Sequence, residues 1–134
     1  MGQHGIQSTF FEPIPPPVPP AHWDELGEQD WFITPIDSWS ACFEFPVIPQ
    51  ISSDKLRINV TRDSDFINIL AVEVYYVAAW HNIYLNVPVP DVWLEMPIPA
   101  GTKLIEKARV MFWNSDTEGT HEAKINDFEI WHIP

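Results

Sequence analysis

Apolar and polar residues alternate with a period of two through most of the chain after residue 30. The clearest example is KLRINVTR, in which Leu56, Ile58 and Val60 share one face and charged or polar residues occupy the other. The same alternation recurs in SWSACFEF, NIYLNV, DVWLEMPI, KARVMFW and DFEIWHI. It is typical of strands with one buried face, and no segment shows a sustained helical period. We therefore predict an all-β fold, an antiparallel β-sandwich, over residues 30–134.

Each alternating segment also predicts which side chains enter the core. The predicted inward sets are Trp39, Ala41, Phe43 and Phe45; Ile83, Leu85 and Val87; Val92, Leu94, Met96 and Ile98; Ala108, Val110 and Phe112; and Phe128, Ile130 and His132. The same registers place Trp93, Trp113 and Trp131 on outward faces.

One segment, DFINILAVEVYYVAAW, is apolar on both faces and predicts a central strand. Its better face carries Leu70, Val72, Val74 and Tyr76, and Glu73 marks the other face. A buried carboxylate needs a partner, so a buried Glu73 predicts an ion pair with an arginine such as Arg57 or Arg109.

The segment before residue 30 has a different composition. Six of the eight residues from Pro13 to Pro20 are proline, which predicts an extended polyproline II arm. A rigid arm loses little entropy on docking. The alternative is that this segment is only a linker, but paired phenylalanines are unusual in linkers. We assign residues 1–29 to a docking arm, with a short helical turn in AHWDELGEQDWF. Its predicted docking residues are Phe10, Phe11, Pro13, Pro15, Pro16, Pro17, Pro19, Pro20 and Trp23.

The net charge of −12 is unevenly distributed. Residues 1–54 hold eight acidic residues and no lysine or arginine, whereas all seven basic residues follow. This sign excludes a nucleic-acid partner and disfavours an anionic membrane surface. The acidic charge serves either solubility or contact with a basic surface on a partner.

Targeting signals and cysteine chemistry are not apparent. The stretch MGQHGIQSTF has neither the basic nor the apolar region of a signal peptide. We therefore expect no signal peptide, and we expect the chain to be made and folded in a cytoplasm. No apolar run approaches the length of a membrane span. Cys42 is the single cysteine, and its place in an alternating segment predicts a small core residue.

Motifs of catalysis are missing as well. There is no GxSxG elbow and no clustered glycine loop, and no two of the five histidines have metal-ligand spacing. The acidic turns RDSD and NSDTEGTHE offer oxygen ligands for Ca²⁺, but neither matches an EF-hand. We expect no enzyme activity, no cofactor and no metal.

The C-terminal stretch PIPAGTKLIEKARVMFWN…AKINDFEIWHIP, with its Asp127-Phe128 pair, resembles the closing strands of carbohydrate-binding-module-type jelly rolls. Phage virion proteins also use this fold. The resemblance implies a jelly-roll topology and no particular activity.

These observations favour a structural or assembly protein of a phage or virus particle, such as a capsid decoration, head-fibre or tail accessory protein. The arm would dock on sister subunits of a homo-oligomer or on a capsid or tail protein, and the final location would be the virion. The outward tryptophans Trp93, Trp113 and Trp131 would then be covered by a protein partner or by the arm. The alternative is a carbohydrate-binding module that uses these three tryptophans as a platform for sugar rings. A sugar-active enzyme of cupin type is a third reading, disfavoured by the lack of paired histidines.

Overall fold

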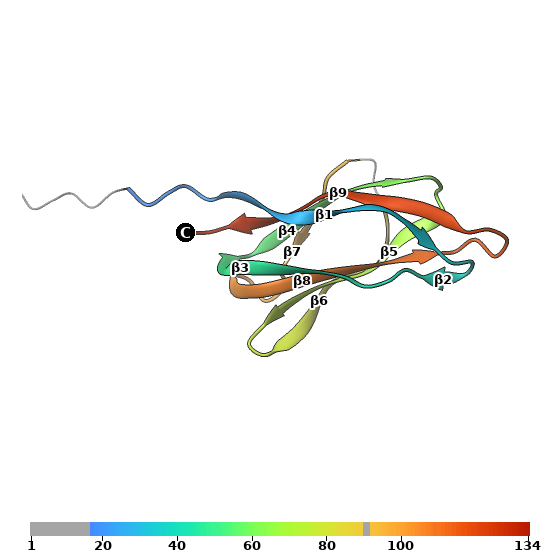
Figure 1. The fold of residues 1–134 in the computed structure, drawn as a ribbon. Helices are drawn as coiled ribbons and strands as arrows, with labels where there is room; N and C mark the ends of the chain where they lie inside the picture. The colour runs from blue at the N-terminus through green and yellow to red at the C-terminus, as the bar shows by residue number, and fades with distance from the viewer. Residues whose placement is uncertain (1–16, 90–91) are drawn as a thin grey trace, which may run out of the picture.

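The structure, a computed structural model, describes residues 17–89 and 92–134 (Figure 1). Within these residues the chain forms strands and no helix, as the alternating pattern predicts. The strands are β1 (His22–Thr34), β2 (Ser38–Trp39), β3 (Phe43–Ser53), β4 (Lys55–Arg62), β5 (Ile67–Tyr76), β6 (Ala79–Pro88), β7 (Leu94–Pro97), β8 (Lys103–Asn114) and β9 (His121–His132).

The strands make two antiparallel sheets that lie in two layers, a β-sandwich-like arrangement (Figure 1). Sheet A has the order β1-β9-β4-β7. In sheet B, β8 pairs with β5 on one side and with both β2 and β3 on the other, and β6 follows β5. The start of β1 and the end of β9 are paired, so the Pro-rich segment leaves the body beside the C-terminus.

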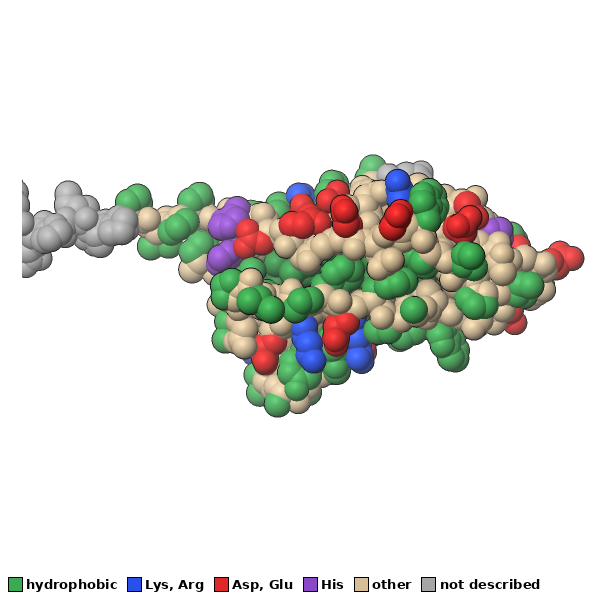
Figure 2. Space-filling view, viewed as in Figure 1, with side chains coloured by type: hydrophobic (Ala, Val, Ile, Leu, Met, Phe, Trp, Pro, Cys, Tyr) green, Lys and Arg blue, Asp and Glu red, His purple; other side chains and the backbone are tan. Residues whose placement is uncertain are grey.

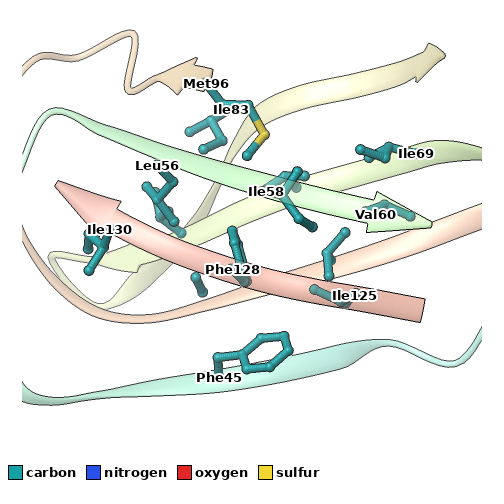
Figure 3. Close-up of a cluster of buried hydrophobic side chains, with 14 of the residues drawn as sticks. Phe45, Leu56, Ile58, Val60, Ile69, Ile83, Met96, Ile125, Phe128 and Ile130 are labelled. Carbon is teal, nitrogen blue, oxygen red and sulfur yellow. The ribbon is translucent and has the colours of Figure 1, made fainter. Parts of the chain in front are cut away.

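The core lies between the sheets and includes the predicted inward residues of several strands (Figure 3). All three predicted residues of β4 are buried, as are Phe128 and Ile130 on β9. Sheet B adds Ala108, Val110 and Phe112 from β8, all fully buried. The predicted inward sets of these three strands are thereby confirmed, except that His132 is half-buried.

β-Bulges change the phase of two strands and correct the predicted inward faces there. In β5 the register shifts between Ile69 and Ala71, so Ile69 is buried and Leu70 is only half-buried. A second shift displaces β6 against β5 and leaves Leu85 64% exposed. An extra residue in one strand reverses every side chain beyond it, which alternation alone cannot reveal.

The segment SWSACFEF is two strands rather than one. β2 ends at Trp39 and β3 begins at Phe43, so the residues between leave the regular ladder. Trp39 is 58% exposed, and Ala41 and Cys42 are also exposed, which corrects the predicted core positions of all three. Val92, which precedes β7, is 67% exposed, so its predicted core position is also wrong.

The boundary between arm and body also needs correction. The sequence pattern assigns residues up to 29 to the arm, but β1 begins at His22 and pairs with β9 along its whole length. No helical turn forms in this segment. Three register shifts between Glu25 and Phe32 interrupt the alternation of β1, so this segment lacks the pattern by which the other strands are predicted.

Candidate functional site

The root of the arm, where β1 starts and β9 ends, brings histidine, tryptophan and carboxylate side chains together. His22 lies opposite His132, and Trp23 lies opposite Trp131. Neighbouring residues of a strand point to opposite faces, so the histidine pair and the tryptophan pair lie on different sides of sheet A. The arm root therefore presents two surfaces.

The outer side of sheet A carries what we call the tryptophan face, composed of Trp23, Trp93, Trp131, Lys55 and Arg57. The Arg57 guanidinium lies 4.3 Å from the ring centre of Trp23 and 4.2 Å from that of Trp93. The Lys55 ammonium lies 4.8 Å from the Trp131 ring and 5.5 Å from the Trp23 ring. Each such contact contributes roughly 0.5–2 kcal/mol, depending on exposure. The two cations thus hold the three indoles in one layer.

Acidic residues surround these cations. Arg57 donates from Nε and Nη2 to Glu129 Oε1, at 2.7 and 2.6 Å. Glu25 and Asp127 lie close to Glu129, with carboxylate oxygens within 4.8 Å of one another. Partial loss of hydration, and then the negative charges of Asp127 and Glu129, raise the pKa of Glu25 to about 7. Near neutral pH, Glu25 is therefore protonated in part of the molecules, and the charge of this surface depends on pH.

On the inner side, the arm root carries a second cluster of three residues. The His22 Nε2 atom lies 3.0 Å from Asp24 Oδ1, and His132 Nδ1 lies 2.8 Å from Asp24 Oδ2. The two imidazole centroids are 4.9 Å apart. Figure 2 shows histidine side chains gathered where the arm joins the body. The sequence contains the signal for this cluster, because His22 and Asp24 have the i,i+2 spacing that places two side chains on one face of a strand.

A cleft of about 390 Å³ opens beside this cluster, at the edge of the sandwich between β1 and β3. Asp24 and His132 line one side, and the β3 segment 46–49 lines the other. Within that segment Val47 is buried, whereas Ile48 is 86% exposed. The cleft therefore has a polar wall and an apolar wall.

The predicted platform tryptophans do not form a single surface. Trp93 and Trp131 both belong to the tryptophan face. Trp113 lies on sheet B, next to Trp39 at a ring distance of 6.1 Å. All three are half-buried, and cations cover part of Trp93 and Trp131.

Sheet B repeats the chemistry of the tryptophan face on its outer side. Arg109 donates to Glu73 Oε1 at 2.7 Å, which confirms the predicted partner of Glu73. The Arg109 guanidinium lies 3.9 Å from the Trp80 ring, and Lys107 covers Tyr75 at 4.7 Å. Carboxylate, cation and aromatic ring are thus stacked on both outer faces.

The predicted arm residues divide at the limit of the described structure. Phe10, Phe11, Pro13, Pro15 and Pro16 lie outside the described residues. Pro17, Pro19 and Pro20 are exposed and belong to no strand. Trp23 lies within β1, as part of the tryptophan face.

The opposite end of the sandwich holds a third polar cluster, centred on His121. Its Nε2 lies 2.7 Å from Asp116 Oδ2 and its Nδ1 lies 3.0 Å from Asp63 Oδ1. The bond to Asp116 raises the pKa of His121, and that bond lowers the pKa of Asp116. The acidic turns considered for Ca²⁺ thus direct these two carboxylates at an imidazole, which fastens the loop between β4 and β5 to the loop between β8 and β9.

The Cys42 thiol is exposed, and its pKa is raised. Partial loss of hydration raises this pKa, although the positive charge of Arg109 acts to lower it. A raised thiol pKa keeps the sulfur protonated and weakly nucleophilic near neutral pH.

The part of the chain that the structure describes holds no helix that could span a membrane. A comparison of the chain with protein-family models, curated proteins and solved structures finds no match.

Proposed function

We propose that the protein is a non-enzymatic assembly protein that docks onto other protein subunits through its Pro-rich arm and the adjacent arm root. The observation that carries this proposal is the exposure of the described arm residues. Residues 17–20 are all exposed and form no strand, and Val18 is 75% exposed. Extended proline-rich backbone offers few donors of its own, and its rigidity reduces the entropy lost on binding.

The arm root extends the apolar surface that a partner could cover. Ile48 is exposed in the wall of the neighbouring cleft, which Asp24 and His132 of the arm root also line. A partner with an apolar groove for the arm and a basic rim for the acidic N-terminal third fits this surface. A sister subunit is our preferred partner, because the seven basic residues of the chain lie on the body.

A place in a phage or virus particle, as a capsid decoration, head-fibre or tail accessory protein, is the setting that we propose for this assembly role. It is supported by the all-β fold and by the resemblance of the C-terminal strands to jelly-roll modules. The jelly-roll topology is part of this proposal.

Carbohydrate binding is the second candidate, and the tryptophan face is the observation that favours it. Sugar rings stack on exposed indoles. However, Arg57 and Lys55 already cover part of Trp23, Trp93 and Trp131. A sugar would have to displace a cation or use the remaining ring surface, so we rank this candidate below protein docking.

The test uses the full chain and compares two double variants of the arm. Phe10→Ser with Phe11→Ser removes the aromatic anchors, and Gln3→Ser with Gln7→Ser is the matched control. Light scattering over a range of concentrations should show oligomers for the wild type and the control, and monomers for the aromatic variant. A monomeric wild type would contradict docking on sister subunits. Glycan binding by that monomer, lost in Trp93→Ala, would establish the second candidate instead.

A further inference from the structure

We propose that His22, Asp24 and His132 form a binding site for a divalent transition metal at the root of the arm. This inference rests on the geometry of these side chains and is independent of the assembly role. Each residue offers one ligand atom, and these three atoms lie within 4.8 Å of one another.

The two strands bring the ligands together by their regular geometry. His22 and Asp24 share one face of β1 because they are two residues apart. His132 lies directly opposite His22 in the ladder between β1 and β9. The ligand atoms therefore belong to paired backbone segments, which limits the rearrangement that a metal would require.

The contacts of His22 require a proton or a metal ion between its imidazole and the carboxylate of Asp24. His22 Nδ1 lies 2.9 Å from the Pro20 carbonyl oxygen, so it must donate its proton there. In the neutral imidazole, Nε2 then carries a lone pair and no proton, and this nitrogen lies 3.0 Å from Asp24 Oδ1. Two electron-rich atoms this close need a second proton on the ring or a metal ion between them.

The Pro20 carbonyl has the role that an outer-shell acceptor plays in known metal sites. Histidine ligands usually donate their second ring N–H to a carbonyl or carboxylate, which fixes the tautomer and directs the other nitrogen at the metal. Pro20 is also the last described proline of the arm before β1. A bound metal would thus restrain the direction in which the arm leaves the body.

The donor set selects the class of metal. Two imidazole nitrogens and one carboxylate suit Zn²⁺, Ni²⁺ or Cu²⁺, whereas Ca²⁺ and Mg²⁺ prefer sites composed of oxygen. The side chains of His22, Asp24 and His132 are 47%, 34% and 33% exposed, so solvent can reach the site and complete the coordination. The neighbouring cluster of Glu25, Asp127 and Glu129 lacks nitrogen ligands, and Glu129 is already paired with Arg57.

The experiment is a calorimetric titration of the full chain with zinc chloride. We expect one equivalent to bind, with affinity reduced at least about tenfold in His132→Gln and in Asp24→Asn. His81→Gln is the matched control, because His81 stacks on Tyr76 on the other sheet, and its affinity should equal that of the wild type. Circular dichroism verifies the fold of each variant, and the near-isosteric Asp24→Asn still tests the site if His132→Gln fails to fold.

Two results would overturn the site: no zinc binding by the wild type, or undiminished binding by both site variants. In the second case zinc would be held by other residues. A result of either kind leaves the assembly proposal intact, because the arm variants are measured without metal.

Discussion

Replacing Gly27 by alanine should destabilise the fold, because the added methyl group would collide with the buried ring of Phe45. A Cβ atom at this position would lie 2.8 Å from Phe45 Cδ2 and 3.0 Å from Cε2. The ring cannot swing away freely, since it is 8% exposed and packs edge-on against Phe128 at 5.3 Å. The backbone of Gly27, with φ of 156°, is in addition unfavourable for a residue with a side chain.

Two costs combine in this variant. Overpacking of a core costs about 1–3 kcal/mol, and an unfavourable backbone region costs on the order of 1–3 kcal/mol. Alanine also reduces the conformational freedom of the unfolded chain, which stabilises the folded state by about 0.4–1 kcal/mol. We therefore expect the free energy of unfolding to fall by about 2–4 kcal/mol, which corresponds to a decrease in Tm of roughly 10 °C for a domain of this size.

Urea unfolding of four proteins tests the reasoning: wild type, Gly27→Ala, Phe45→Leu and the double variant. Because leucine leaves room for the new methyl group, the double variant should lose at least about 1 kcal/mol less than the sum of the single losses. Gly119→Ala is the control, since its Cβ would lie 3.5 Å from Asp116, an ordinary contact, and should change stability by less than about 0.5 kcal/mol. A neutral Gly27→Ala, or strictly additive losses, would refute the proposed collision.

Two further predictions concern a turn and a titrating cluster. Val77 and Ala78 form the two-residue turn between β5 and β6 with φ of 48° and 61°, a geometry that favours Asn-Gly. The double replacement Val77→Asn with Ala78→Gly should raise the free energy of unfolding by about 1–2 kcal/mol, and an unchanged urea midpoint would contradict this. His121 has a raised pKa, so its ion pairs stabilise the fold fully below about pH 6.5. This stabilisation is lost as the pH rises through the folded-state pKa of His121. The pKa of Asp116 is lowered, so its carboxylate stabilises the fold fully above about pH 3.8. This stabilisation is lost as the pH falls through the folded-state pKa of Asp116. The stability difference between wild type and His121→Gln should therefore shrink from about pH 6 to pH 9 in urea titrations, and parallel curves would disprove the role of the imidazolium.

The sequence predicts those strands whose faces are set by local alternation alone. In β4 every second residue is apolar, and Leu56, Ile58 and Val60 are all buried, because the register shift against β9 places its extra residue in β9 and leaves β4 regular. Where the ladder contains a bulge, the burial pattern depends on pairing with a distant strand. The exposed Leu85 shows this limit, since its phase is set by a shift against β5 and not by its own neighbours.

The candidate site illustrates the same limit more strongly. The tryptophans on the outer faces could be predicted, but not the cations that cover them, because Arg57 reaches Trp23 and Trp93 from another strand. The contact of His132 with His22 and Asp24 could not be predicted from the sequence, for a related reason. Asp24 and His132 are 108 residues apart in the chain, and only the pairing of the first strand with the last brings them into contact.

The covered tryptophans bear directly on where a partner can bind. An indole whose face already contacts a guanidinium has lost part of its apolar surface, and removing that cation would also break the ion pair of Arg57 with Glu129. The outer face of sheet A is therefore costly to open. Val18 on the arm and Ile48 in the cleft have no such cover, with 75% and 86% of their surface exposed. A partner that covers these two residues gains apolar contact without dismantling an existing interaction, and this is why we place docking at the arm and the cleft rather than on the tryptophan face.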